Sequence, residues 1–229
     1  FPTYPDPSMS VNAFVYPIEG VYFGLGVYDG ALNDGIRTGG RGPSTFFNNA
    51  KSDDYFLIGE LGFTWPDSAK WGAGRFAIGP WYHSGNFARF DGSTAMGTEG
   101  FYMLIEQRSW RENPEAKDDE QGVSLFFQYG YADQHVSEIT HHVGVGLFSV
   151  GPIRERDDDT AGIMLSFVDL SDVSGAGFTQ DETALELFYR LQVTPHISVK
   201  PDLQYIFDPS GSRMIDDALV GTLRAELTF

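Results

Sequence analysis

Charged side chains of opposite sign recur two or four residues apart in this 229-residue chain, spacings that place both on one face of a β-strand. A guanidinium offers a planar fork of donors and a carboxylate offers acceptors, so together they can bind hydroxyl groups of a polar solute. The alternative is a solvated ladder of charges that supports the strands and touches no solute. The sets, with their aromatic neighbours, are Glu106, Arg108 and Trp110; Glu186, Phe188 and Arg190; Lys200 and Asp202; and Arg224 and Glu226.

The elements that must position these side chains are strands, because apolar residues alternate with a period of two along most of the chain. The pattern indicates an all-β protein with no domain boundary, so residues 1–229 form one unit. Eleven strands are expected, near residues 9–17, 21–28, 55–65, 72–82, 101–110, 123–132, 140–149, 161–168, 183–193, 196–207 and 218–229.

Each expected strand has one nearly pure apolar face, and the strand charges lie on the opposite face. Many strands have the ~9–11 residues that a tilted strand needs to cross a bilayer, and aromatic residues gather near their ends. These features predict an antiparallel transmembrane β-barrel with its apolar face toward lipid. A soluble carbohydrate-binding β-sandwich, with apolar residues inward, is the alternative. The ten strand charges are Glu60, Arg75, Glu106, Arg108, Glu186, Arg190, Lys200, Asp202, Arg224 and Glu226.

Composition excludes several classes of protein. The chain has 32 acidic and 15 basic residues, a formal charge of −17, so it lacks the basic face that nucleic acid requires. It has no cysteine, which removes disulfides and thiolate metal sites. No stretch is long and apolar enough for a membrane-spanning helix.

The connections alternate between longer and shorter. If the C-terminus lies on the periplasmic side, the longest connection, Asp29–Asp54, falls outside and the shortest, Thr194–Pro195, falls inside. Eleven strands cannot close a barrel with antiparallel neighbours, because the first and last would run in the same direction. We therefore expect further strands upstream of Phe1, in keeping with the absence of a starting Met and of a signal peptide.

Other motifs give weaker signals. His141 and His142 point to opposite faces of one strand and cannot readily share a metal ion. Asp157–Asp159 is expected to be a solvated turn rather than a Ca²⁺ site, and Gly24–Gly30 lacks the spacing of a dinucleotide loop. No catalytic residue, metal site or cofactor is therefore predicted. An outer-membrane hydrolase, using His83 or His141 beside a hydroxyl nucleophile, is the alternative enzyme hypothesis.

Two features of the charged face leave alternatives open. A β-bulge near Trp110 would turn its side chain outward. The glycines on the same face either seat a folded-in loop or relieve crowding at a bend, and the second interpretation is favoured. These glycines are Gly24, Gly26, Gly144 and Gly146.

Three stretches carry a resemblance to a known family: Tyr4–Pro17, Val21–Gly30 and Leu187–Pro209. The chain resembles the C-terminal part of carbohydrate-selective porins of the OprB type over essentially all its residues. The resemblance implies a 16-stranded barrel in the bacterial outer membrane, in contact with lipid, that passes small sugars passively and needs no cofactor. Porins of this size class are often trimers, so a homo-oligomer is among the assemblies that the resemblance allows. The stretch Asp29–Asp54 has no close counterpart in the family.

The resemblance makes the charged face the wall of a water-filled channel, where solute selectivity arises. The candidate solute-binding residues are Glu60, Arg75, Glu106, Arg108, Trp110, Glu186, Arg190, Lys200, Asp202, Arg224 and Glu226. The ten strand charges cancel, so the whole −17 falls in connections, with −11 outside and −6 on the periplasmic side. Acidic mouths around a balanced wall predict mild cation selectivity.

Overall fold

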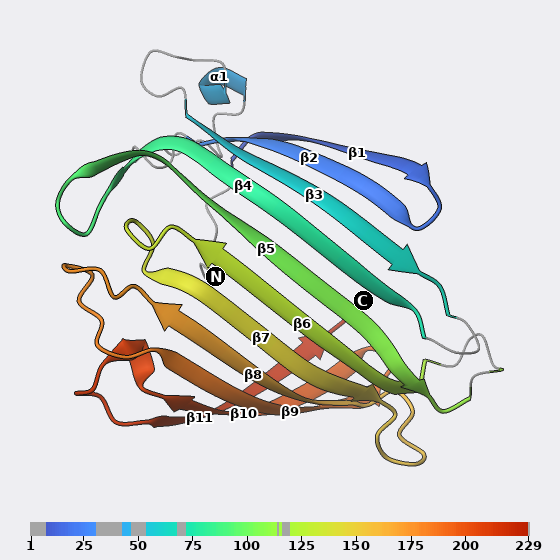
Figure 1. The fold of residues 1–229 in the computed structure, drawn as a ribbon. Coiled ribbons are helices and arrows are strands. Elements are labelled where there is room, and N and C mark those ends of the chain that lie inside the picture. The colour runs from blue at the N-terminus through green and yellow to red at the C-terminus, as the bar shows by residue number, and fades with distance from the viewer. Residues whose placement is uncertain are drawn as a thin grey trace.

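The computed structural model describes residues 8–30, 43–46, 54–67, 72–113, 115 and 120–228. They form one antiparallel sheet whose spatial order follows the order in the sequence (Figure 1). All eleven predicted strands are confirmed. The strands are β1 (Ser10–Ile18), β2 (Val21–Asp29), β3 (Tyr55–Trp65), β4 (Gly74–Ala88), β5 (Thr94–Arg111), β6 (Gly122–Ala132), β7 (Ile139–Val150), β8 (Thr160–Leu170), β9 (Glu182–Thr194), β10 (Ile197–Phe207) and β11 (Ala218–Leu227).

The largest difference from the prediction lies between β4 and β5. The expected connection at residues 83–100 is mostly strand, and the two strands project together as a long hairpin (Figure 1). The ladder is irregular between His83 and Asn86, and the polar run there breaks the alternation that would have revealed the strand. Two short helices, α1 (Pro43–Phe46) and η2 (Pro209–Gly211), were not predicted, because each spans about one turn.

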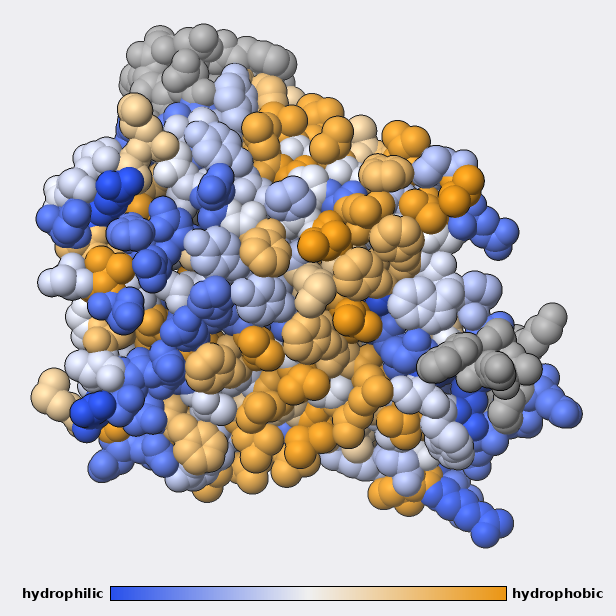
Figure 2. Space-filling view, viewed as in Figure 1, coloured by the Kyte–Doolittle hydropathy of each residue, from blue (hydrophilic) through white to orange (hydrophobic). Residues whose placement is uncertain are grey.

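Apolar side chains lie on the outside of this sheet rather than in a core. Ala77 and Ala95 are the buried hydrophobic residues of the described part, whereas Leu25, Leu187 and Leu223 are 69%, 52% and 74% exposed. Figure 2 shows apolar residues as a band over the middle of the strands that face the viewer, with hydrophilic residues toward both strand ends. A soluble sandwich would bury this face between two sheets. The single sheet with its apolar face exposed instead matches a transmembrane barrel wall.

The two edges of the sheet are open. Within the described residues β1 pairs with β2 alone and β11 with β10 alone. No helix in this part of the chain is long and apolar enough to cross a membrane. Most of the Asp29–Asp54 connection, and the terminal Phe229, lie outside the described residues.

Candidate functional site

Cross-strand register places the ten predicted strand charges on one face, here called the inner face. Arg75 lies opposite Glu106, and Lys200 lies opposite Arg224. The strands are longer than predicted and take in further charges near their ends, so the connections do not hold the whole net charge as expected. These additional charged residues are Asp29, Glu99, Arg111, Asp169 and Glu182.

The first inner-face cluster surrounds Glu60 on β3. Tyr22 donates a hydrogen bond to Oε1 of Glu60 at 2.6 Å, and Tyr102 donates to Oε2 at 2.5 Å. Arg75 donates to Oε1 from Nη2 at 3.3 Å and to the Tyr22 hydroxyl from Nε at 3.1 Å. Both carboxylate oxygens therefore have donors, and Arg75 is held in one orientation with Nη1 left to bind another molecule.

Glycines on neighbouring strands make room for the two tyrosines. A Cβ at Gly62 would collide with the Tyr22 ring, and one at Gly79 would lie 2.5 Å from Cζ of Tyr102. Each ring therefore lies over the backbone of the adjacent strand. Inner-face glycines thus seat side chains of neighbouring strands, which is the observed role of Gly24 and Gly146 as well, under Phe14 and Phe126. The crowding that Gly24 and Gly146 relieve therefore comes from packed rings rather than from a bend.

The second cluster joins β9 and β10. Nζ of Lys200 lies 3.7 Å from Oε1 of Glu186 and 4.0 Å from Oδ2 of Asp202. The same ammonium lies 4.0 Å from the centroid of the Phe188 ring, a cation–π contact. Gln204 donates to Oε2 of Glu186 at 3.2 Å. Here one ammonium lies between two carboxylates and covers an aromatic ring.

The third group of inner-face charges joins β9 and β11. Nε of Arg190 lies 3.7 Å from Oε2 of Glu226, across the strand that separates them. Ser198, on that intervening strand, is 3.4 Å from the same oxygen. Arg224 and Glu226, predicted as a set, share a face, but the Glu226 carboxylate pairs with Arg190.

The predicted Glu106, Arg108 and Trp110 set is only partly brought together. A bulge interrupts the ladder between Arg108 and Trp110, and Trp110 then lies opposite Val123 on the outer face, where it is 55% exposed. Trp110 is therefore no inner-face residue, because the extra residue of a bulge reverses the side to which the next side chain points. Arg108 instead forms an ion pair with Asp67 at 3.4 Å.

The connection between β7 and β8 holds a buried charge that the sequence did not reveal. Asp159 is 1% exposed, and its carboxylate accepts hydrogen bonds from Nε and Nη2 of Arg156, at 2.8 and 2.7 Å. It also accepts hydrogen bonds from Tyr189 and from the backbone N–H of Gln192. Burial alone would raise the pKa of Asp159, but these donors outweigh it and lower the pKa to about 2. The prediction of a solvated turn is thus wrong for Asp159, whose hydrogen bonds to Tyr189 and Gln192 hold the connection against β9.

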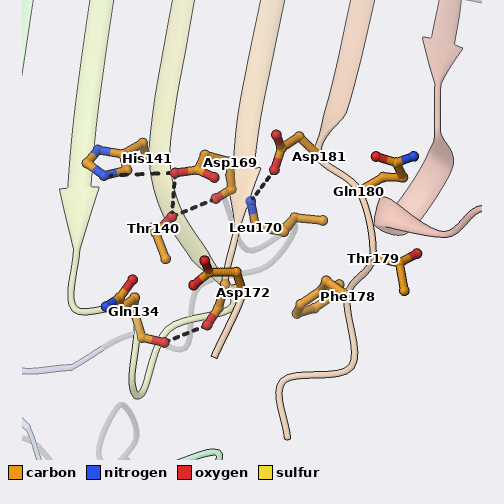
Figure 3. Close-up of a pocket in the computed structure, with 11 residues that line it drawn as sticks. Gln134, Thr140, His141, Asp169, Leu170, Asp172, Phe178, Thr179, Gln180 and Asp181 are labelled. Carbon is orange, nitrogen blue, oxygen red and sulfur yellow. Dashed lines mark hydrogen bonds and ion pairs between the residues drawn. The ribbon is translucent and has the colours of Figure 1, made fainter. Parts of the chain in front are cut away.

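A polar pocket of ≈390 Å³ lies at the opposite end of the strands (Figure 3). Thr140 donates to Oδ2 of Asp169 at 2.9 Å, and Nε2 of His141 lies 3.9 Å from the same oxygen. Asp181 accepts the backbone N–H of Leu170. Asp181 thus holds the β8–β9 connection against the end of β8, and the Ser171 hydroxyl holds the β6–β7 connection by donating to the backbone carbonyl of Gln134.

The hydrolase hypothesis requires a hydroxyl that donates to a histidine. The Thr140 hydroxyl donates to Asp169 rather than to His141, whose Nδ1 contacts the Tyr129 hydroxyl. Nδ1 of His83 accepts a backbone N–H. The sequence did not predict the contact of 3.0 Å between Nε2 of His142 and Oγ of Ser166 on the inner face. Among the described residues, no group of three or more His, Asp or Glu side chains could hold a metal ion.

Comparisons with known proteins agree with this geometry. The family described as carbohydrate-selective porin, OprB family, matches residues 1–229. Porin B of Pseudomonas aeruginosa is 25% identical over 150 residues, which cover 57% of this chain and 32% of that protein. The solved structure of Pseudomonas putida OprB at high pH superposes with a TM-score of 0.79 at 19% identity, covering 99% of this chain and 60% of that one. Its low-pH structure gives a TM-score of 0.62 at 16% identity, covering 95% and 54%.

Proposed function

The chain belongs to the OprB family of carbohydrate-selective porins, which are bacterial outer-membrane proteins, and we propose that it forms part of the wall of a pore through which small sugars diffuse passively. The chain spans about a third of the curated relative that it matches and 60% of the solved structure. The activity proposed here is therefore that of the whole pore.

The observation that carries the proposal is the inner face. It carries hydrogen-bond donors and acceptors held in fixed orientations, and its ten predicted strand charges, five basic and five acidic, cancel. Arg75 is held by Glu60 and Tyr22, and Lys200 is held between two carboxylates. A neutral sugar passing this wall exchanges hydrogen bonds to water for hydrogen bonds to these groups, so the net gain at each site is small enough for the sugar to leave again. The inner face is accordingly the lumen of the pore.

The open edges support a longer barrel. β1 and β11 point in the same direction along the sheet, so they cannot pair as antiparallel neighbours. We propose that about five further strands of the same barrel, as the family resemblance implies, lie between these edges. Cysteines placed at Ala13 on β1 and at Leu223 on β11, which both face outward, should form no disulfide with each other in the complete protein, because the further strands separate them.

Passive, sugar-preferring diffusion is tested by liposome swelling with the complete protein. Glucose should enter faster than a neutral non-sugar of similar size, and no energy source should be needed. Equal rates would contradict the sugar preference.

An enzyme is the less supported alternative. The proposal of a channel without hydrolytic activity is supported by the family and by the hydroxyl of Thr140, which donates to a carboxylate rather than to a base. The enzyme hypothesis would have to use His142 and Ser166, whose side chains are in contact. Hydrolysis of phospholipid or ester substrates by the purified protein, abolished by Ser166→Ala, would favour the enzyme.

A further inference from the structure

We propose that a recess on the inner wall between β4 and β7 is a sugar-binding subsite of this pore. The Phe126 ring would receive the face of a pyranose, and the neighbouring charged groups would receive its hydroxyls. The inference deepens the proposed function and rests on it, because it takes the solute to be a sugar. The recess has a volume of ≈470 Å³, and its inner-face lining residues are Arg75, Glu106, Arg108, Ser124, Phe126 and Phe148.

The Phe126 ring is laid against the wall by a glycine. A Cβ at Gly146, directly opposite on β7, would lie 2.5 Å from Cε1 and 2.7 Å from Cζ of Phe126. The ring therefore occupies the space over the Gly146 backbone, with one side on the wall and the other toward the lumen. Pyranose rings carry C–H groups on their faces, and these groups pack against such an aromatic surface.

Donors and an acceptor for the hydroxyls stand beside the ring. Glu106 is the cross-strand partner of both Arg75 and Phe126, so the three form one row across β4, β5 and β6. Arg75 is fixed through Nε and Nη2 and retains Nη1 as a donor. Arg108 is oriented by Asp67.

Glu106 is the acceptor of this arrangement. Its side chain is exposed, and within the described residues its carboxylate makes no hydrogen bond or ion pair. A fixed guanidinium beside an accessible carboxylate can hold adjacent hydroxyls of one sugar, one as acceptor and the other as donor.

A second ring in the lumen, Phe188, is less accessible to a sugar than Phe126. Phe188 also lies over a glycine, Gly162 on β8. The ammonium of Lys200, however, lies 4.0 Å from the Phe188 centroid and covers that ring. No cation covers Phe126 among the residues that the structure describes, so its lumen side is open to a solute.

The test compares Phe126→Ala with Phe127→Ala in the complete protein. Phe127 is adjacent in sequence but faces outward opposite Val145, so its variant controls for the loss of a ring from β6. Glucose is titrated against the ionic current of single pores in planar bilayers, which gives the half-saturating concentration. Phe126→Ala should raise this concentration about fivefold, Phe127→Ala should leave it unchanged, and Phe126→Tyr should preserve it, because an aromatic face contributes roughly this factor.

A second substitution addresses the hydroxyl-binding half of the site. Glu106→Gln should raise the half-saturating glucose concentration about threefold, since hydrogen bonds to a charged acceptor are stronger than those to a neutral one. Glu106 is exposed and unbonded, so this variant should fold even if Phe126→Ala does not.

The outcomes separate the subsite from the function. Swelling assays with glucose and the acyclic polyol sorbitol report the preference of the wild-type pore. Equal entry of the two solutes into wild-type liposomes would refute the proposed function. A wild-type preference for glucose that survives both Phe126→Ala and Glu106→Gln unchanged would overturn the subsite and leave the pore function intact. A smaller preference for glucose over sorbitol in either variant than in the wild-type pore supports the subsite.

Discussion

Tyr102 on β5 donates a hydrogen bond of 2.5 Å to Glu60 on β3, reaching across the intervening strand β4. Gly79 on β4 makes this possible, because the Tyr102 ring occupies the space that any larger side chain would need. The contact ties three strands together on the inner face. It also fixes the carboxylate that orients Arg75 toward the lumen.

Tyr102→Phe should lower the free energy of unfolding by about 1–3 kcal/mol, because it removes the hydroxyl and leaves one oxygen of a half-buried carboxylate without a donor. Heat-induced loss of the fast-migrating folded band in gel electrophoresis measures the change. Tyr131→Phe is the matched control, since the Tyr131 hydroxyl makes no hydrogen bond with the described residues. An equal loss in both variants would contradict a specific role for the bond to Glu60.

Asp159 should make stability sensitive to acid. Its pKa in the folded protein, about 2, lies below the usual aspartate value of 3.8, so its ionised form stabilises the fold. This contribution is fully present above about pH 4 and is lost as the pH falls through 2. Unfolding followed by tryptophan fluorescence should show wild-type stability dropping across this window.

Substitution of Asp159 tests the same network. Asp159→Asn should destabilise the protein by about 2 kcal/mol at neutral pH and remove most of the pH dependence of its stability. The neutral amide makes weaker hydrogen bonds to the two Arg156 N–H donors than the carboxylate does. Asp158→Asn, at an exposed neighbouring position, should change neither property. Identical acid profiles for wild type and Asp159→Asn would show that the network does not contribute.

Lys200→Gln should shift the pore toward cation selectivity. The substitution leaves Glu186 and Asp202 facing the lumen without the ammonium that lies between them. Reversal potentials under a salt gradient measure the shift. Arg89→Gln removes the same charge at the exposed tip of the β4–β5 hairpin and serves as the control. At 1 M salt, where the screening length is about 3 Å, the effect of Lys200→Gln should persist and that of Arg89→Gln should vanish.

The wild-type pore should itself be mildly cation-selective at low salt. The net charge of −17 lies largely in the connections and strand ends, so the mouths attract cations while the balanced wall does not repel a neutral sugar. The reversal potential should fall as salt rises from about 0.01 to 1 M, because exposed charges are screened. An anion preference would contradict this distribution of charge.

The strands and their two faces could be predicted from the sequence because side-chain direction in a strand depends only on parity. Glu60 and Arg75 are placed on the inner face by counting alone, as are Lys200 and Asp202. Counting alone was insufficient where a local irregularity broke the alternation, and at Trp110 the bulge that the sequence left open as an alternative is the observed arrangement. The bulge before Trp110 sent that ring outward, and the irregular ladder after His83 concealed the outer half of the β4–β5 hairpin.

The period, the number of strands and the apolar outer face follow from residue types two positions apart, so they could be predicted from the residues alone. Which side chains meet depends on how the strands pair in the folded sheet. The bond from Tyr102 to Glu60 depends on cross-strand register and on a glycine in a third strand, and the burial of Asp159 depends on Tyr189 and Gln192 some thirty residues away. Such contacts join strands distant in sequence, so no local pattern encodes them.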